Sequence, residues 1–318
     1  MNAMPASRID PIGGDAALVD GGLSVVVCSW KRPERLRRCL KGLYDQSVLP
    51  REILVVGVEG DADTAHVVDD LRSQGLATRV VWQRGRAGLG NARNLGWSSA
   101  RGEWVAFIDD DAIADPRWIE SIGKHFQDGT TALAGQVRDP EDGRIISEGS
   151  FRFWLRDLHL CPAGCNMAFR KSWLEAVGGF DENLAYGFDD HDIGIKLTLS
   201  GVRVTDAPEA IVWHRRSWGP ARETLGPNLP QYAWSGAYLI ARHAGSLGVS
   251  KAEYFARFCA LLIELIAMSR SPRSDRGRFR ARGPSSLVRT TWSVSRSSFL
   301  GTLFGWRAAK TSSRPARQ

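Results

Sequence analysis

The chain has 318 residues, of which 43% are hydrophobic and 24% charged. This balance is typical of a folded globular protein, excludes wholesale disorder, and leaves room for one large domain with an appendage. The net charge of +7 is uneven, because residues 270–318 hold twelve basic side chains against one aspartate, so the preceding 269 residues carry −4. The basic isoelectric point therefore reflects the tail and says nothing about the rest of the chain, which is mildly acidic.

The five cysteines are odd in number and scattered along the chain, which argues against a secreted disulfide framework and favours a reducing compartment. Residues 1–22 lack the charged start and the apolar stretch of a signal peptide, and the sequence contains no run of eighteen apolar residues. We therefore expect a cytoplasmic protein, at most peripheral to the inner face of a membrane. Cys161 and Cys165, near His159, lack the second ligand pair of a structural zinc site, so we interpret them as buried small side chains.

The first part of the chain repeats the order strand, loop, helix. The apolar run Leu23–Cys28 predicts a strand covered on both faces, and Pro33 opens a helix with apolar residues at helical spacing. Further strands are expected at 52–56, 79–82 and 103–108, and further helices at 64–74 and 91–100. This alternation predicts a parallel sheet whose ligands bind beyond the carboxyl ends of the strands.

From about residue 130 the pattern changes. We expect strands at 132–137, 164–169 and 210–213, helices at 171–177 and 193–200, a proline-containing linker at 219–230, and helices at 232–240 and 254–268. The predicted organisation is a flexible leader (1–22), a domain at 23–218 with halves 23–115 and 116–218, a helical extension (219–270), and a basic, flexible tail (271–318).

Three consecutive carboxylates, Asp109, Asp110 and Asp111, end the apolar run Trp104–Ile108. Adjacent like charges are tolerable only when they are well solvated or when a cation neutralises them. One interpretation is a divalent metal site with hard oxygen ligands, suited to Mg²⁺ or Mn²⁺ and a phosphate substrate. The other is a solvated loop that caps the segment starting near Pro116. The triplet alone does not decide between them.

Three further features, the cluster Asp189–Asp192, Arg93 and His214, each have a structural and a functional interpretation. The cluster Asp189–Asp192 stands at a helix start, where the helix dipole favours carboxylates, so N-capping alone would explain it. Arg93 follows a glycine-rich loop and can either pair with phosphate oxygens or lie exposed to solvent. His214 follows an apolar strand, where a lone histidine is more often structural than a ligand. The glycines at 85, 88 and 90 have neither the spacing nor the place of a dinucleotide-binding fingerprint.

Six short motifs follow one another in a fixed order: Val25–Pro33, Gly90–Gly96, Phe107–Asp111, Gly178–Glu182, Asp189–Asp192 and Val212–His214. With them, the stretch from residue 23 to about 217 resembles the inverting glycosyltransferases of family 2. The resemblance implies an α/β fold of the GT-A type, a nucleotide-sugar-binding fold with a mostly parallel sheet flanked by helices. In this chain a helical, basic C-terminal extension would follow it.

The resemblance also implies roles for individual residues. Asp109 would bind the ribose and sugar side of the donor, Asp111 would bind the metal, and His214 would complete metal coordination, as in some members. Asp190 would be the general base, with Asp189 where the family commonly has glutamate. The family's base-binding aspartates after the second strand are displaced here, so Glu59 or Asp61 would take that role. The candidate donor-binding residues are Ser29, Arg32, Glu59, Arg93, Asn94, Asp109 and Asp110.

The predicted function is metal-dependent, inverting transfer of a sugar from a nucleotide-sugar donor to a hydroxyl acceptor, which is a glycan, a lipid-linked molecule or a small molecule. The divalent cation is Mn²⁺ or Mg²⁺. One alternative is a non-catalytic nucleotide-sugar-binding member, given the altered segment at Gly57. The other is a nucleotidyltransferase, which leaves Asp189–Asp192 and the turn Gly178–Asp181 unexplained.

The C-terminal tail interleaves arginines with Trp292, Phe299, Phe304 and Trp306. This composition predicts peripheral contact with an acidic membrane surface and no nucleic-acid partner, because no nucleic-acid-binding fold accompanies it. Plain disorder is the alternative interpretation.

Overall fold

The computed structural model describes residues 22–73, 78–83, 88–126, 129–152, 160–214 and 229–250, together with residues 253, 256 and 259. Residues 1–21 of the predicted leader and the whole of the predicted tail lie outside these residues, as does nearly all of the predicted helix at 254–268. Within the described residues, we find no helix that is both long and apolar enough to cross a membrane.

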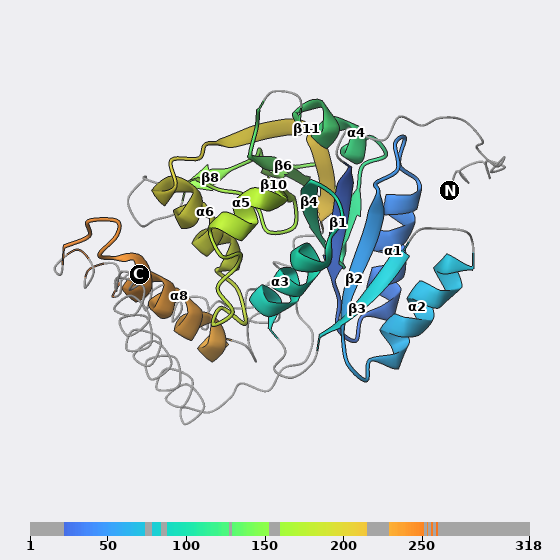
Figure 1. The fold of residues 1–318 in the computed structure, drawn as a ribbon, viewed down its shortest axis with the longest axis horizontal. Coiled ribbons are helices and arrows are strands. Elements are labelled where there is room, and N and C mark those ends of the chain that lie inside the picture. The colour runs from blue at the N-terminus through green and yellow to red at the C-terminus, as the bar shows by residue number, and fades with distance from the viewer. Residues whose placement is uncertain are drawn as a thin grey trace, which may run out of the picture.

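A nine-stranded sheet forms the centre of the fold (Figure 1). Its strands lie in the order β3-β2-β1-β4-β10-β6-β11-β5, with β7 paired to β6. Their bounds are β1 Leu23–Cys28, β2 Glu52–Val58, β3 Thr78–Gln83, β4 Trp104–Asp109, β5 Ala112–Ala114, β6 Ala132–Arg138, β7 Ile145–Ser147, β10 Met167–Arg170 and β11 Val204–His214. A separate pair joins β8 (Phe151–Arg152) to β9 (Leu160–Cys161).

The two halves of the sheet differ in strand direction. The strands β3, β2, β1 and β4 are parallel neighbours, as predicted. In the second half, β10 is antiparallel to both β4 and β6, and β5 is antiparallel to β11, which itself is parallel to β6. The sheet is therefore mixed. The expected parallel order holds throughout its first half and for the pair of β6 with β11, while β10, β5 and β7 are antiparallel to their neighbours. Strand β5 follows β4, and β10 follows β9, without an intervening helix, so neither strand is placed by the helical crossover that joins parallel neighbours.

Helices cover both faces of the sheet (Figure 1). The helices α1 (Pro33–Tyr44), α2 (Ala62–Arg72) and α4 (Trp118–Lys124) pack in one hydrophobic core with Val25 and Val27 of β1. The helices α3 (Leu89–Ser99), α5 (Lys171–Ala176) and α6 (Asp189–Leu199) contribute to a second core with Val26 of the same strand. Successive residues of one buried strand thus face opposite layers.

Several elements depart from the prediction. Helix α6 begins at Asp189, four residues earlier than predicted, after Phe188 in a left-handed conformation (φ 65°). Strand β11 begins at Val204 rather than at residue 210. The sequence did not indicate its first residues because they are mostly half-buried or exposed and lack the apolar run of its end. Helix α8 (Leu229–His243) includes the end of the predicted linker. The elements β5, β7, β8, β9 and α4 were not predicted; all are short.

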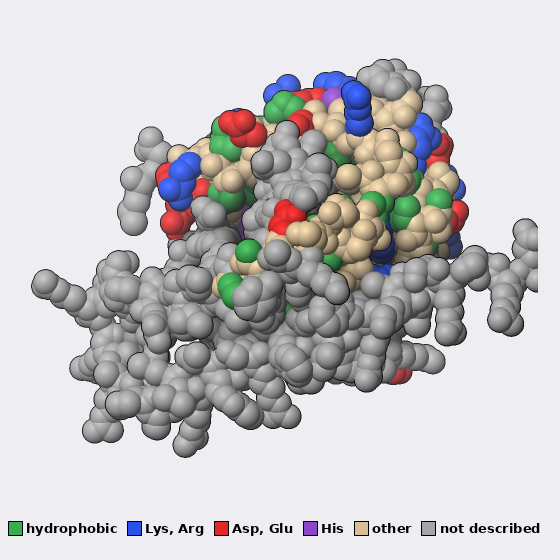
Figure 2. All heavy atoms as spheres, turned by 90° about the vertical axis from the view of Figure 1, so that its left-hand side faces the viewer, with side chains coloured by type: hydrophobic (Ala, Val, Ile, Leu, Met, Phe, Trp, Pro, Cys, Tyr) green, Lys and Arg blue, Asp and Glu red, His purple; other side chains and the backbone are tan. Residues whose placement is uncertain are grey.

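On the part of the described surface that faces the viewer in Figure 2, charged side chains of both signs are interspersed. The view shows Lys and Arg beside Asp and Glu rather than one block of a single sign.

Candidate active site

A cavity of about 1040 Å³ opens at the carboxyl ends of β1, β2 and β4. Its walls come from the turn after β1, the end of β2, the start of α3, the turn after β4, residues 183–186, His214 and the first turns of α8. The volume lies just above the range of about 300–1,000 Å³ that is usual for small-molecule sites. The predicted rim is therefore the place where the candidate site lies.

The acidic triplet lies where β4 ends: Asp109 is the last residue of β4, and Asp110 and Asp111 form the turn before β5. In the described part of the chain, ligand atoms of Asp109, Asp111 and His214 lie within 4.8 Å of one another. His214 reaches the triplet because β5 and β11 are antiparallel and place Ala112 opposite it. Its Nε2 lies 3.1 Å from Asp111 Oδ1. Two carboxylates and one imidazole are a suitable donor set for a divalent cation such as Mn²⁺.

Asp110 turns away from this group. Its Oδ2 accepts a hydrogen bond of 2.8 Å from the Ser29 hydroxyl, and its Oδ1 accepts one of 3.2 Å from Arg32. Burial raises the pKa of Asp110 to about 6, although Arg32 and the Ser29 hydrogen bond pull it down. Asp110 is therefore bound to Ser29 and Arg32, and these hydrogen bonds fix the turn between the two candidate metal ligands, Asp109 and Asp111.

Asp111 lies among positive charges. Arg35 is 2.9 Å and Arg32 is 3.7 Å from its Oδ2. Burial alone would raise the pKa of Asp111, but the His214 hydrogen bond, the His214 charge and the two arginines outweigh burial and lower the pKa to about 2. Burial lowers the pKa of His214, but Asp111 and the neighbouring carboxylates raise it above its ordinary value overall. The cluster is thus held by cationic side chains, as repulsion between its carboxylates requires.

Arg93 links the triplet to the second acidic cluster. Its side chain is only 4% exposed, it forms an ion pair with buried Asp189, and its Nη2 lies 3.3 Å from Asp109 Oδ1. The same nitrogen donates a hydrogen bond of 2.9 Å to the carbonyl of Gly164. The alternative of a solvent-exposed arginine is therefore wrong. Arg93 does not line the cavity, and its phosphate-binding role stays a prediction.

Asp190 differs from its neighbour Asp189. Its Oδ2 accepts a hydrogen bond of 3.3 Å from the backbone amide of Gly164, its Oδ1 accepts one of 2.9 Å from that of His191, and its side chain is 23% exposed. Asp190 is not among the residues lining the cavity. Gly164 contacts both Asp190 and Arg93, and Arg93 in turn forms an ion pair with Asp109. Asp190 is thus a partly exposed carboxylate of the second cluster, whereas Asp189 is buried in an ion pair with Arg93.

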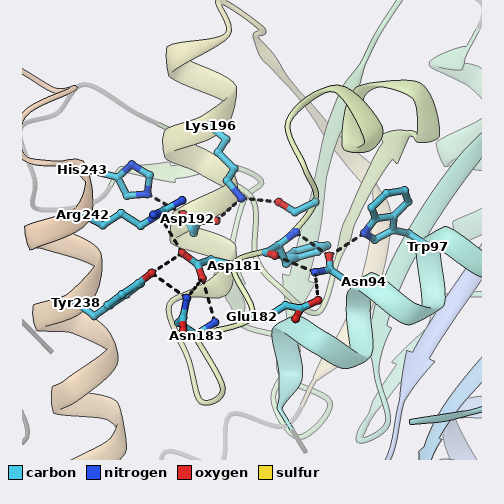
Figure 3. A network of polar contacts seen from close by, with 12 residues as sticks. Asn94, Trp97, Asp181, Glu182, Asn183, Asp192, Lys196, Tyr238, Arg242 and His243 are labelled. Carbon is cyan, nitrogen blue, oxygen red and sulfur yellow. Dashed lines mark hydrogen bonds and ion pairs between the residues drawn. The ribbon is translucent and has the colours of Figure 1, made fainter. Parts of the chain in front are cut away.

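Besides Arg93, two more predicted donor-binding residues lie away from the cavity. Asn94 donates to the carbonyl of Phe180 (2.9 Å) and accepts from the amide of the same residue (2.8 Å), which ties α3 to the turn before α6 (Figure 3). Glu59 is exposed and does not line the cavity. For both, donor binding stays a prediction.

Asp61 has a structural role. Its carboxylate caps α2 by accepting from Thr64, and it accepts a further hydrogen bond of 2.7 Å from the amide of Lys31. Burial raises the pKa of Asp61, but these hydrogen bonds outweigh burial and lower it below its ordinary value. Asp61 therefore fixes the turn after β1, where Ser29 and Arg32 lie.

The cysteines interpreted as buried side chains have little thiolate character. Cys161 is buried and Cys165 half-buried, and both are free thiols. Desolvation raises the pKa of each well above its ordinary value. His159 lies outside the described residues.

Residues that the sequence did not suggest also line the cavity. They are Asn183, Ala185 and Tyr186 before α6, and Pro230, Gln231, Trp234 and Ser235 of α8. No local pattern identifies them, because α8 reads as an ordinary helix preceded by a proline-containing segment. Only its packing against the residues before α6 brings it to the site.

Comparisons with known proteins agree on a family. Residues 24–178 match the model of glycosyl transferase family 2, and residues 158–215 match that of the N-terminal domain of galactosyltransferase. A curated relative, the pre-mycofactocin glycosyltransferase of Mycobacterium tuberculosis, is 26% identical over 240 residues, which cover 70% of this chain and 48% of the relative. The chain spans about half of the length, or less, of the first curated relatives that it matches.

Solved structures are similar as well. A mannosyltransferase from Pyrobaculum calidifontis, in complex with GDP-Man and Mn²⁺, has a TM-score of 0.54 at 19% identity and covers 93% of this chain and 88% of its own. Residues 1–349 of S. aureus TarS, in complex with UDP-GlcNAc, have a TM-score of 0.52 at 15% identity and cover 92% and 93%. At such identity the likeness shows the fold alone, and it confirms the predicted GT-A class.

Proposed function

Because the chain belongs to glycosyl transferase family 2 and is a glycosyltransferase, we propose that it moves a sugar from a nucleotide-sugar donor to a hydroxyl acceptor with inversion, and that the reaction depends on a divalent cation. Both solved neighbours were determined with nucleotide sugars, GDP-Man in one and UDP-GlcNAc in the other. The proposal extends that class of donor to this chain.

One observation carries the proposal: the grouping of Asp109, Asp111 and His214 on the wall of the large cavity. These side chains fit Mn²⁺, which accepts both carboxylate and imidazole ligands. When bound there, the cation would neutralise charge that builds on the leaving diphosphate. Arg32 and Arg35, which already pair with Asp111, add positive charge at the same place.

Asp190 is the proposed general base. Two backbone amides hold its carboxylate, and part of the side chain remains exposed to receive a proton. The acceptor oxygen would attack the anomeric carbon, the bond from that carbon to the diphosphate would break, and the acceptor proton would pass to Asp190. A single displacement of this kind inverts the anomeric configuration.

We also propose that the basic tail contacts an acidic membrane surface. The support is its composition alone, because the tail lies outside the described residues. The full chain should float with vesicles that contain anionic lipid and not with neutral vesicles; equal behaviour with both would overturn this part of the proposal.

The reaction is tested by incubating the full chain and Mn²⁺ with a panel of UDP-, GDP-, ADP- and dTDP-sugars. Release of a nucleoside diphosphate together with free or transferred sugar is expected for at least one base. Release of pyrophosphate would instead indicate nucleotidyl transfer. Binding of a nucleotide sugar without any turnover, with or without added acceptors, would identify a non-catalytic member.

A further inference from the structure

Helix α8 contributes to the candidate site although it lies beyond both family-matched segments, which end at residues 178 and 215. Four of its residues line the cavity: Pro230, Gln231, Trp234 and Ser235. The family resemblance assigns them no role. Their presence in the wall raises the question of which substrate they meet.

The helix is fixed to the domain by two buried carboxylates (Figure 3). At the first, Asp181 Oδ2 accepts a hydrogen bond of 2.9 Å from the hydroxyl of Tyr238 and forms an ion pair of 3.0 Å with Arg242. Asn183 completes this contact by donating to Asp181 (2.9 Å) and to Tyr238 (3.1 Å). The segment that leads into α6 is therefore joined directly to α8.

At the second carboxylate, Asp192 is fully buried between α6 and α8. His243 Nε2 lies 2.7 Å from its Oδ1, and Lys196 Nζ lies 2.8 Å from its Oδ2. Tyr232 and Phe188 add a ring contact with centroids 4.5 Å apart. Since these contacts flank Asp190 in sequence, α8 is held in a fixed position relative to the proposed base.

The wall built by α8 combines a fixed aromatic ring with polar groups. Trp234 stacks on Tyr238 with ring centroids 5.0 Å apart and an interplanar angle of 10°, so the anchored tyrosine supports it. Tyr186 and the exposed Gln231 line the same cavity. An aromatic face beside hydroxyl and amide groups suits a sugar ring, whose C–H face packs on the aromatic ring while its hydroxyls form hydrogen bonds.

The position of this wall distinguishes the acceptor from the donor. The turn after β1 and the end of β2 lie on the nucleotide side predicted for this fold, and the candidate metal ligands line the same cavity as these segments and α8. The α8 wall instead adjoins residues 183–186, which lead into the helix that carries Asp190. A general base must contact the acceptor hydroxyl, so the acceptor has to enter from this side.

We propose that α8 forms the acceptor subsite, that Trp234 is its stacking platform, and that the acceptor is a sugar. This inference rests on the proposed glycosyl transfer. It assigns acceptor recognition to a helix outside the matched family domain.

The test uses the full chain with Trp234→Ala, Trp234→Phe and, as a matched control, Trp82→Ala, a partly exposed tryptophan of β3 that does not line the cavity. The probes are UDP and GDP with Mn²⁺, the donor found by the nucleotide-sugar panel, and methyl glycopyranosides of glucose, galactose, mannose and N-acetylglucosamine. For Trp234→Ala we expect KM for the accepted glycoside to rise about tenfold or more, a factor that corresponds to about 1.4 kcal/mol. Nucleoside diphosphate affinity and the rate of donor hydrolysis should stay within about twofold of wild type, because Trp234 is proposed not to contact the donor.

The remaining variants make the test independent of folding. Trp234→Phe should recover most of the acceptor affinity, and Trp82→Ala should behave as wild type. An unchanged KM in Trp234→Ala, or an equal loss of nucleoside diphosphate binding, would overturn the inference, as would a wild type that hydrolyses its donor but uses none of the glycosides. If the wild type neither hydrolyses nor transfers any nucleotide sugar, the proposed function itself fails.

Discussion

The buried carboxylate of Asp192 provides a quantitative test of how α8 is held. Asp192→Asn keeps the shape of the side chain but removes the charge that faces Lys196, 2.8 Å away, and His243, 2.7 Å away. Breaking a buried ion pair costs about 3–5 kcal/mol, because the remaining charge stays buried without a partner. Lys196 keeps one acceptor, the carbonyl of Gly179 at 2.5 Å, which places the expected loss near the lower limit, about 3 kcal/mol. A loss of this size lowers the melting temperature by roughly 6–12 °C in a domain of about 150–250 residues.

The assay is reversible urea unfolding of the full chain, with thermal unfolding alongside it. The matched control is Asp70→Asn, which removes one partner of the 2.9 Å ion pair between Asp70 and Arg37, with side chains 59% and 32% exposed. A pair this exposed contributes at most about 1 kcal/mol. Two results would refute the reasoning: a loss below about 1 kcal/mol in Asp192→Asn, or equal losses in both variants.

Two further predictions concern Asp190 and the acid stability of the fold. Asp190→Asn should lower kcat by about 10²–10⁴-fold, the usual contribution of a general base, while calorimetry finds nucleoside diphosphate affinity unchanged; a large loss of affinity would remove Asp190 from the base role. Burial raises the pKa of Asp192, but the His243 hydrogen bond and the Lys196 charge outweigh burial and hold the pKa at about 2, below its ordinary 3.8. Its contribution to the free energy of unfolding is thus present above about pH 4 and is lost as the pH falls toward 2, because the unfolded state binds the proton first. Unfolding free energies between pH 5 and 2 should fall more steeply in wild type than in Asp192→Asn, and parallel curves would contradict this.

The first half of the fold follows from local sequence patterns. Strands β1, β2 and β4 are continuous apolar runs, and α1 carries its buried leucines at helical spacing, so their type and order are predictable. Short elements such as β5 have too few residues to show a period. Their place depends on pairing partners far along the chain, as β5 pairs with β11.

The same limit applies to the site. The three carboxylates of the triplet are visible in the sequence, but their different roles are not. Asp110 is set apart by Ser29 and Arg32, and Asp111 by His214, all of which arrive through tertiary contacts. The burial of Arg93 and the place of Trp234 likewise depend on the packing of α6 and α8.

The central claim is that Asp109, Asp111 and His214 hold the cation of a nucleotide-sugar donor. It is tested most directly by calorimetric titration of UDP and GDP with and without Mn²⁺, in wild type and in Asp111→Ala. Wild type should bind one of them at least tenfold more tightly with Mn²⁺, a difference of about 1.4 kcal/mol. Asp111→Ala should lose that Mn²⁺-dependent gain and keep only the Mn²⁺-independent affinity. Full Mn²⁺-dependent affinity in Asp111→Ala would contradict the account and place the metal elsewhere.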